Sequence, residues 1–399
     1  MLEFAQRIRT METSAGIVRG LFNGIVDPNT INFSAGAPAN VTLPVEEVRE
    51  ISNEILRRDT RGIEALQYNN PRGIPELRKV VADYLLPRRG INVASPDDVM
   101  IVQGGLETLN LVCQLFINKG DVVLVEEPTF MHAIEIFEMF EAKCISVKCD
   151  EEGVVLEDLA AKQERYNAKM LYVIPSFQNP TGKTMSLARR KAVAKFGSEK
   201  NIVILEDDPY VELRYAGEDL PAIKAFDETG NVIFANSFSK IFSPGMRLGY
   251  VYAAPEVIFH IFDAKTATNS HTAVLNQILC AEFFNRGLYE KHIEEARAVY
   301  REKQTTAISL IKKYMPEGTK VTSPEGGLFV WVELPGDDID TTELLKECAQ
   351  IHVSFMAGAG FFAEEGKGRN CMRLSFSNLS EDKIEEGMKR LGDLIKSKM

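Results

Sequence analysis

The stretch NSFSKIFSPGMRLGY, residues 236–250, sets one lysine, Lys240, among hydroxyl-bearing and apolar side chains. Most lysines are solvated surface charges. Lys240, however, follows a predicted central strand and stands beside Phe238 and Ile241, which leave an ammonium group little contact with water. Desolvation lowers the pKa of a lysine and makes it a nucleophilic amine, as a lysine that forms a Schiff base must be. The stretch therefore predicts a reactive lysine at the end of a buried strand.

Outward from this stretch, short apolar runs alternate with amphipathic segments. The runs are DVMIVQ, DVVLVEE, MLYVIP, NIVILEDD and NVIFANS, and segments such as LETLNLVCQLFINKG and SLARRKAVAKFGSEK separate them. Runs that are apolar throughout are typical of strands buried on both faces. The pattern predicts an α/β fold, with a parallel sheet covered by helices on both sides.

The C-terminal part of the chain has a different pattern. Residues 288–314 predict one long charged helix, and strands and helices then alternate over a short span. A chain of 399 residues suggests two or three domains at ~150 residues each. We expect an N-terminal segment (1–45) associated with the small domain and the active site, a large domain (46–290) and a small α/β domain (291–399).

Composition excludes several classes of protein. A net charge of −11 disfavours nonspecific binding to nucleic acid or to an anionic membrane. The six cysteines form no C-x-x-C pair and the five histidines no H-E-x-x-H motif, so no zinc site or disulfide scaffold is indicated. Free thiols suit a reducing cytoplasm, and the sequence has neither a signal peptide's apolar region nor a run of ~18 apolar residues. We expect a cytoplasmic protein without a metal.

A reactive lysine suggests a pyridoxal phosphate (PLP) site, which also needs a cup for the phosphate. VQGGLETLN, residues 102–110, runs from a strand through two glycines into a helix, so the amides of Gly105 and Leu106 and the positive helix end suit a dianion. Alone, such a Gly-Gly pair is also an ordinary tight turn. Further phosphate donors stand in the opening stretch, namely Ser237, Ser239 and Arg247.

The cofactor ring needs an acid and a hydrogen-bond donor. In VILEDDPY, residues 203–210, we assign Asp207 to the ring nitrogen, which it keeps protonated, and Tyr210 to the ring oxygen. Asn179 in PSFQNPTG, residues 175–182, follows another strand and is a second donor to that oxygen. Helix capping by the acid and an ordinary Asn-Pro turn are the alternatives.

Together, SFSKIFSPGMRLGY, PSFQNPTG, EDDPY, QYNNPRGIPELR and MRLSFS resemble the fold-type-I PLP-dependent enzymes, specifically the class I/II aminotransferases. The opening INFSAGAPANVTLPVE is most similar to the 2-aminoadipate/kynurenine aminotransferase-like branch, and the resemblance covers nearly the whole chain. It implies a large domain with a mostly parallel, seven-stranded sheet between helices, and a small α/β domain.

The resemblance also implies roles for individual residues. Lys240 carries the cofactor as an internal aldimine and moves the proton between the substrate Cα and the cofactor. Asp207, Tyr210 and Asn179 contact the ring as assigned above. The remaining implied contacts are Phe130 stacking on the ring, Ser237, Ser239 and Arg247 at the phosphate, Arg373 on the substrate carboxylate with Asn179 and Gly36 beside the substrate, and Tyr68 reaching the neighbouring subunit's phosphate in a homodimer.

One position departs from that branch, which often has Gly-Ser-Gln where this chain has Gly104, Gly105 and Leu106. Side-chain donors to the phosphate are missing there, while the backbone amides remain. We expect a somewhat lower affinity for PLP and unchanged chemistry.

The expected reaction is ping-pong transfer of an amino group from an L-amino acid to a 2-oxo acid, with 2-oxoglutarate as acceptor. Arg19, in SAGIVRGLF, either pairs with the side chain of an acidic substrate or is a solvated helix arginine. A mobile Arg19 implies a broad donor range, including aromatic, branched-chain and 2-aminoadipate donors.

Alternative functions remain within the same fold. A β-lyase or a decarboxylase shares the cofactor site. A transcriptional regulator with an aminotransferase-like domain is disfavoured, because such regulators carry an N-terminal DNA-binding domain and this acidic chain begins its enzyme-like pattern within the first ~40 residues. A non-catalytic binding module is less favoured still, because every expected polar group is present.

Overall fold

The computed structural model describes residues 3–5, 7–10, 27, 29–336 and 338–399. Its largest sheet has the strand order β2-β9-β8-β7-β6-β3-β4-β5. The strands are β2 (Val99–Val102), β9 (Gly249–Tyr252), β8 (Val232–Ser237), β7 (Val203–Asp207), β6 (Met170–Val173), β3 (Val122–Glu127), β4 (Lys143–Asp150) and β5 (Gly153–Val154).

The sheet is mostly parallel, as the sequence predicts. Only β9, which is antiparallel to β2 and β8, and the edge strand β5, which is antiparallel to β4, depart from this. The resemblance implied seven strands, and the eighth is β5, a two-residue strand that a tight turn after β4 adds at the edge.

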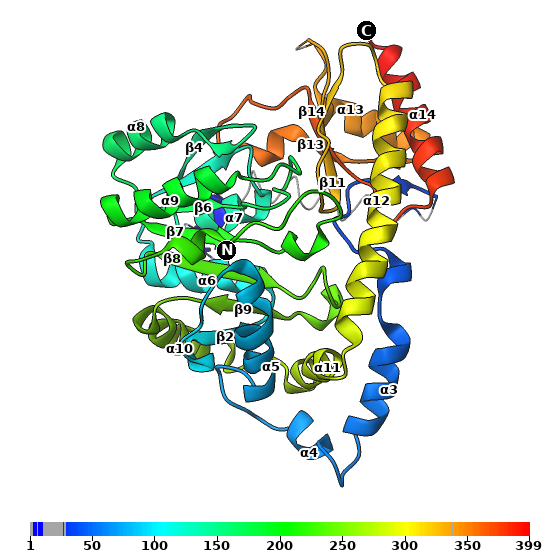
Figure 1. The fold of residues 1–399 in the computed structure, drawn as a ribbon. Helices are drawn as coiled ribbons and strands as arrows, with labels where there is room; N and C mark the ends of the chain where they lie inside the picture. Colours follow the sequence, from blue (N-terminus) through cyan, green and yellow to red (C-terminus); the bar gives the residue numbers. More distant parts are fainter. Residues whose placement is uncertain (1–2, 6, 11–26, 28, 337) are drawn as a thin grey trace.

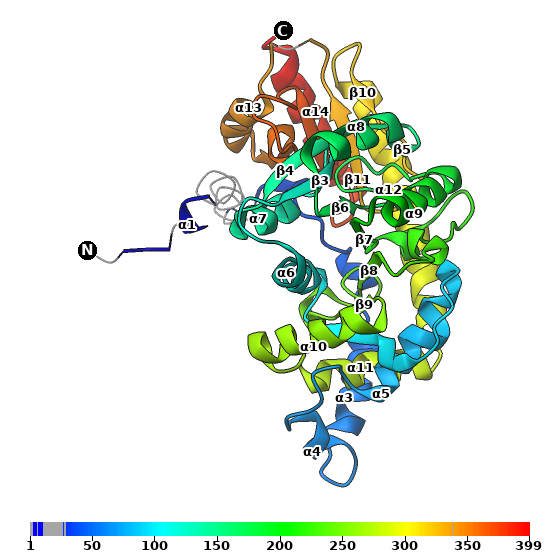
Figure 2. The same ribbon diagram turned by 90° about the vertical axis from the view of Figure 1, so that its left-hand side faces the viewer.

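Helices cover both faces of this sheet. On one face α6 (Gly105–Phe116), α7 (Met131–Met139) and α10 (Pro255–Asn269) pack against one side of the strands, and on the other α8 (Leu156–Tyr166) and α9 (Leu187–Lys200) pack against the opposite side (Figure 2). Strands β2, β6 and β8 are buried at every residue. Two apolar faces explain why their sequences read as continuous apolar runs.

The C-terminal residues form a second, smaller layer beside the large sheet (Figure 1). The predicted helix at 288–314 is confirmed as α12 (Leu288–Tyr314), which packs on α14 (Glu381–Lys396). Four antiparallel strands lie beside them in the order β10 (Lys320–Val321), β11 (Phe329–Glu333), β14 (Cys371–Ser375) and β13 (Met356–Ala357), with α13 (Thr341–Cys348) nearby.

Two segments near the N-terminus lie against different layers: residues 7–10 contact α7 on the large sheet, and residues 31–32 join the smaller layer. Strand β1 (Ile31–Asn32) pairs in parallel with β12 (Val353–Ser354), 322 residues further along the chain. The assignment of residues 1–45 to the small domain and the boundaries at 45 and 290 remain a proposal. The other helices in the described ranges include α1 (Arg7–Thr10), α3 (Val45–Ile55), α4 (Gly62–Ala65), α5 (Pro75–Val80) and α11 (Val274–Asn285).

Two features of the whole molecule bear on the sequence analysis. All six cysteines are free thiols. Among the described residues, no helix combines the length and the apolar character that a membrane span requires.

Candidate active site

The predicted site residues lie where strands of the large sheet end. Asp207 is the last residue of β7, Ser237 is the last residue of β8, and Gly104 follows β2 by two residues. Phe130 and Asn179 stand in the loops that follow β3 and β6. Because ligands of open α/β sheets bind beyond the carboxyl ends of the strands, this edge is the expected place for a cofactor.

Lys240 lies partly buried in the loop after β8, and its Nζ donates a hydrogen bond to the Gly36 carbonyl oxygen (2.6 Å). The same nitrogen lies 6.0 Å from the centre of the Tyr210 ring. Desolvation, and after it the positive charges of Arg373 and Arg247, lower the pKa of Lys240 to about 8. A lysine with this pKa is neutral and nucleophilic in a large fraction of molecules near pH 8.

Gly36 approaches this lysine closely because it has no side chain. A Cβ at this position would overlap the ring of Phe329, which comes from strand β11. Gly36 thus brings a backbone carbonyl to the lysine that a larger residue would hold away.

Asp207 is buried, and the hydroxyl of Tyr172 in β6 donates to its Oδ2 (2.8 Å). Desolvation raises the pKa of Asp207 to about 7; the Tyr172 hydrogen bond opposes this rise, and the charge of Asp208 adds to it. A cation placed beside this carboxyl group, such as a protonated pyridine nitrogen, favours the charged form of Asp207.

Tyr172 stands inside an apolar run, MLYVIP, that is typical of a core strand, so the sequence alone does not mark it as a site residue. The available signal was chemical, since a buried tyrosine hydroxyl usually has a hydrogen-bond partner.

Asn179 links two of the other predicted residues. Its Nδ2 donates to the Tyr210 hydroxyl (3.4 Å), and its Oδ1 accepts from Nη1 of Arg373 (2.9 Å). Arg373, in β14, also donates from Nη2 to the Ser34 carbonyl oxygen (2.6 Å). The large sheet and the smaller layer therefore meet at one hydrogen-bonded cluster.

Among the described residues, no acidic side chain pairs with Arg373. Its guanidinium carbon lies 4.1 Å from the centre of the Phe329 ring and 5.3 Å from that of Phe361, and its buried Nε has no hydrogen-bond partner. Burial lowers the pKa of Arg373 to about 10, so it still carries its charge at neutral pH. A buried, charged and incompletely bonded guanidinium is suited to a carboxylate.

The predicted phosphate cup is assembled from two segments far apart in the sequence. Helix α6 begins at Gly105, and a Cβ on Gly105 would lie 4.0 Å from the Cβ of Ser237. The Ser237 hydroxyl donates to that of Ser239 (2.9 Å). Arg247 donates from Nη2 to the Gln103 carbonyl oxygen (3.4 Å) next to the helix start. A helix N-terminus, two hydroxyls and a guanidinium are thus gathered at one place, as a phosphate dianion requires.

Gly104 and Gly105 differ in what they tolerate. Gly104 has φ +82°, and a Cβ there would collide with the Arg247 guanidinium. Gly105 begins a helix without a positive φ, and its Cβ would make only an ordinary contact with the Cβ of Ser237. The glycine that the fold requires is therefore Gly104, while the residue that departs from the related branch, Gly105, is free to carry a side chain.

The remaining predicted residues that the structure describes form no hydrogen bond or ring contact with Lys240, Asp207 or Arg373. Leu106, in the first turn of α6, is partly exposed. Phe130 precedes α7, and its ring meets that of His132 edge-on (5.3 Å). Tyr68 is 83% exposed and contacts the His271 ring (5.7 Å). Arg19 lies outside the described residues.

Comparison with known proteins agrees with this geometry. Residues 28–391 match the family model of aminotransferase class I and II. Aromatic-amino-acid aminotransferase 1 of Thermococcus litoralis is 36% identical over 99% of this chain and 94% of its own length. The 2-aminoadipate transaminase of Thermus thermophilus is also 36% identical, over 96% of this chain and 94% of its own. The solved structure of Pyrococcus horikoshii kynurenine aminotransferase in complex with PMP has a TM-score of 0.93 at 37% identity, with 99% and 97% of the two chains covered.

The residues at the edge of the sheet fit pyridoxal 5′-phosphate as a cofactor. They supply a lysine of lowered pKa, a buried acid, an anion-binding helix end, and a buried guanidinium whose Nε has no partner. Together with the match over almost the full length, this shows that the chain belongs to the class I and II aminotransferases and is a PLP-dependent aminotransferase.

Proposed function

We propose that this aminotransferase takes amino groups from a broad set of L-amino acids, including aromatic, branched-chain and 2-aminoadipate donors, and gives them to 2-oxoglutarate by a ping-pong mechanism. The observation that carries the substrate side of this proposal is Arg373. Its buried guanidinium has an unpaired Nε and no acidic partner among the described residues, so it suits the α-carboxylate that every donor has in common. The named relatives act on aromatic amino acids and on 2-aminoadipate, which supports the donor range.

Each residue of the site has a proposed part. When bound, PLP withdraws electrons from the substrate Cα. Lys240 holds the cofactor covalently and, once released, takes the Cα proton on its Nζ. Asp207 holds a proton on the ring nitrogen through its negative charge, and Asn179 and Tyr210 donate to the ring oxygen. Phe130 lies against the ring face.

The phosphate group is proposed to lie between the start of α6 and the loop after β8. The amides of Gly105 and Leu106, the hydroxyls of Ser237 and Ser239, and the guanidinium of Arg247 are its donors. Gly36, whose carbonyl oxygen accepts from Lys240, is proposed to lie beside the substrate.

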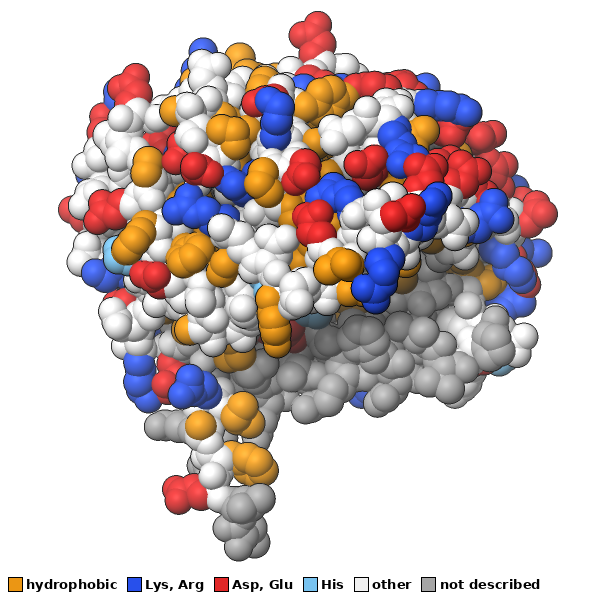
Figure 3. All heavy atoms as spheres, turned by 90° about the horizontal axis from the view of Figure 1, so that it is seen from below, with side chains coloured by type: hydrophobic (Ala, Val, Ile, Leu, Met, Phe, Trp, Pro, Cys, Tyr) orange, Lys and Arg blue, Asp and Glu red, His pale blue; other side chains and the backbone are white. Residues whose placement is uncertain are grey.

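We also propose a homodimer in which Tyr68 completes the phosphate site of the partner subunit. Tyr68 is exposed, and so are several apolar residues earlier in the sequence, namely Val41, Val45, Ile63 and Leu66. The face seen in Figure 3 mixes apolar side chains with charges of both signs. Where exposed apolar residues form a contiguous patch, they mark a surface that a partner covers.

Subunit complementation tests the dimer. The Lys240→Ala and Tyr68→Ala variants, each of low activity alone, should regain about a quarter of wild-type activity after co-refolding, because half of the sites in a mixed dimer contain neither change. No recovery, in a mixture that sedimentation identifies as dimers, would assign Tyr68 to the surface.

The cellular location and the role of Arg19 remain part of this proposal. The six free cysteines support a reducing compartment such as the cytoplasm. Arg19 is proposed to pair with the side-chain carboxylate of acidic donors.

A donor panel tests the reaction. Purified protein with added PLP should form glutamate from 2-oxoglutarate with aromatic, branched-chain and 2-aminoadipate donors. The Arg19→Ala variant should raise KM for acidic substrates selectively and leave KM for apolar and aromatic donors unchanged. Absence of glutamate with every donor would overturn the proposal. Release of ammonia or carbon dioxide from the donor would favour the β-lyase or the decarboxylase alternative.

A further inference from the structure

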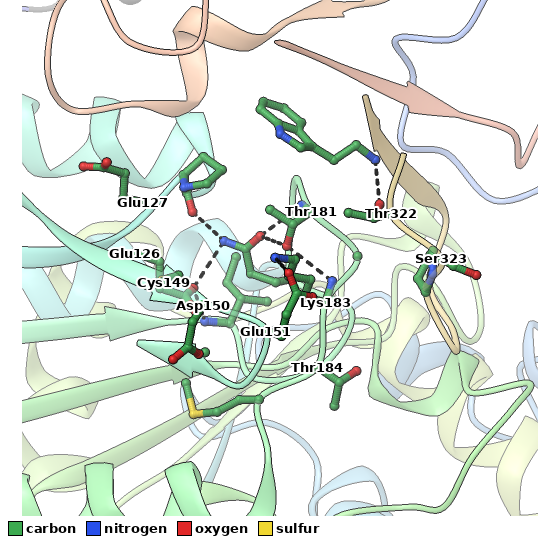
Figure 4. A pocket seen from close by; sticks show the side chains of 18 of the residues that line it. Glu126, Glu127, Cys149, Asp150, Glu151, Thr181, Lys183, Thr184, Thr322 and Ser323 are labelled. Carbon is green, nitrogen blue, oxygen red and sulfur yellow. Dashed lines mark hydrogen bonds and ion pairs between the residues drawn. The ribbon is translucent and has the colours of Figure 1, made fainter. Parts of the chain in front are cut away.

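Gln178 joins two loops that end at the active site. It stands directly before Asn179, is 5% exposed, and uses its whole side-chain amide within the protein. Its Nε2 donates to the Pro128 carbonyl oxygen (2.7 Å) and to Oε2 of Glu126 (3.4 Å). Its Oε1 accepts from the backbone amide (3.0 Å) and the hydroxyl (2.7 Å) of Thr181 (Figure 4).

The two loops carry residues that act on different sides of the proposed cofactor position. The loop after β3 contains Pro128 and, two residues on, Phe130, which is proposed to lie against the ring face. The loop after β6 contains Asn179, which is proposed to donate to the ring oxygen and which accepts a hydrogen bond from Arg373. The Gln178 amide therefore links the positions of Phe130, Asn179 and Arg373, three side chains that are proposed to contact cofactor or substrate.

Glu126 anchors this link at the end of β3. It is 3% exposed, and its Oε2 also accepts from the backbone amide of Ile174 (2.9 Å), at the end of β6. The carboxyl group thus bonds both to the adjacent strand and to Gln178.

A cavity lies directly beside these hydrogen bonds. Its volume is about 640 Å³, and it separates the loops after β3 and β6 from the β10–β11 segment, which contributes Thr322 and Ser323 to the opposite wall (Figure 4). Atoms that line a cavity lack packing partners on that side. On the side of the cavity, hydrogen bonds rather than packed side chains hold the two loops together.

We propose that Gln178 is a positioning residue for the cofactor and the substrate, because its amide fixes the distance between the loop that carries Phe130 and the loop that carries Asn179. The inference rests on the proposed function, since these two residues matter in this way only if they contact PLP. The alternative is that Gln178 contributes to stability alone.

Gln163 offers a matched control. It is 8% exposed and also bonds a loop through both ends of its amide, donating to the Ala168 carbonyl oxygen (3.3 Å) and accepting from the Ala168 amide (3.1 Å). Ala168 precedes β6, so this loop lies at the opposite end of the strand from Asn179.

The test compares Gln178→Ala with Gln163→Ala, both purified with PLP. We expect similar losses of melting temperature. Only Gln178→Ala should lose bound PLP at least about fivefold faster, weaken the visible circular dichroism of the bound cofactor, and raise KM for amino donors more than it lowers kcat. If Gln178→Ala does not fold, Gln178→Glu replaces it, because it keeps the shape and removes both donated hydrogen bonds.

The outcomes separate this inference from the function on which it rests. A Gln178 variant that matches Gln163→Ala in PLP loss, dichroism and KM overturns the positioning role. Wild-type protein that binds no PLP overturns the proposed site itself.

Discussion

Tyr172→Phe removes one hydroxyl and leaves the rest of the site in place. The phenyl ring fills the same space and keeps the edge contact with Phe137, whose ring centre lies 5.5 Å away. What is lost is the hydrogen bond to Oδ2 of Asp207, which is 2.8 Å long and buried. The substitution therefore tests whether the charge of Asp207 matters for the reaction.

The size of the effect follows from that one bond. A hydrogen bond to a charged group contributes about 1.5–3 kcal/mol, which corresponds to roughly 1–2 units of pKa. The pKa of Asp207 is about 7 with the Tyr172 hydroxyl in place. Without the hydroxyl, a larger fraction of Asp207 is neutral, so less negative charge is available to hold a proton on the ring nitrogen. We expect removal of the substrate Cα proton to slow by about 10- to 100-fold.

Single-turnover kinetics measures this step directly. PLP-loaded protein is mixed with an excess of an amino donor, and the change in cofactor absorbance is followed, with PLP affinity measured separately. Tyr289→Phe is the control, because Tyr289 also donates from a buried hydroxyl to a carboxylate, Oε2 of Glu212 (3.0 Å), without touching Asp207.

A correctly folded Tyr172→Phe variant whose single-turnover rate lies within about twofold of Tyr289→Phe would refute the reasoning. In that case either another group holds the charge of Asp207, or the ring nitrogen does not depend on it.

Three further predictions concern the cup, the substrate clamp and the interior. Gly105→Ser should keep or tighten PLP binding, because nothing lies closer than 4.0 Å to the added Cβ, whereas Gly104→Ala should weaken it, because the added Cβ collides with Arg247. Fluorescence titration with PLP measures both affinities. Weaker binding by Gly105→Ser than by Gly104→Ala would contradict the proposed phosphate site. Arg373→Lys should raise KM for all amino donors by about 10- to 100-fold, since an ammonium cannot replace the fork of the guanidinium, with little change in the visible spectrum of bound PLP. Desolvation raises the pKa of Glu126 from 4.5 to about 8, so the folded state holds a proton that the unfolded state releases, and stability falls as pH rises through this window. Glu126→Gln removes that dependence. Calorimetry should show that the melting temperature of the variant, relative to that of wild type, increases by roughly a degree or more between pH 5 and pH 9. A difference that stays constant would mean that Glu126 does not titrate in this range.

Most of the large sheet was predictable because its strands are apolar on both faces. Helix α12 was predictable in the same way, since its charged and apolar residues follow a helical period without interruption. The two-residue strand β5 was not predicted, because so short a strand arises from a turn after β4 and leaves no periodic signal.

The hydrogen bonds that support the site were harder to foresee. Tyr172 stands opposite Leu205 in the register of β6 and β7, which puts its side chain on the same face as Asp207, two residues further on. That register is not visible in either strand alone. Gln178 precedes an Asn-Pro pair that predicts an ordinary loop. Its hydrogen-bond partners, Glu126 and Pro128, lie about 50 residues away, so the sequence around Gln178 does not reveal them.

The most direct test of the whole account is the site of cofactor attachment. The purified protein is loaded with PLP and reduced with borohydride, which makes a lysine–cofactor bond permanent, and its peptides are then mapped by mass spectrometry. We expect the cofactor mass on the peptide that contains Lys240, and its loss in Lys240→Ala. A cofactor mass on another lysine, or on no peptide of the wild-type protein, would contradict it.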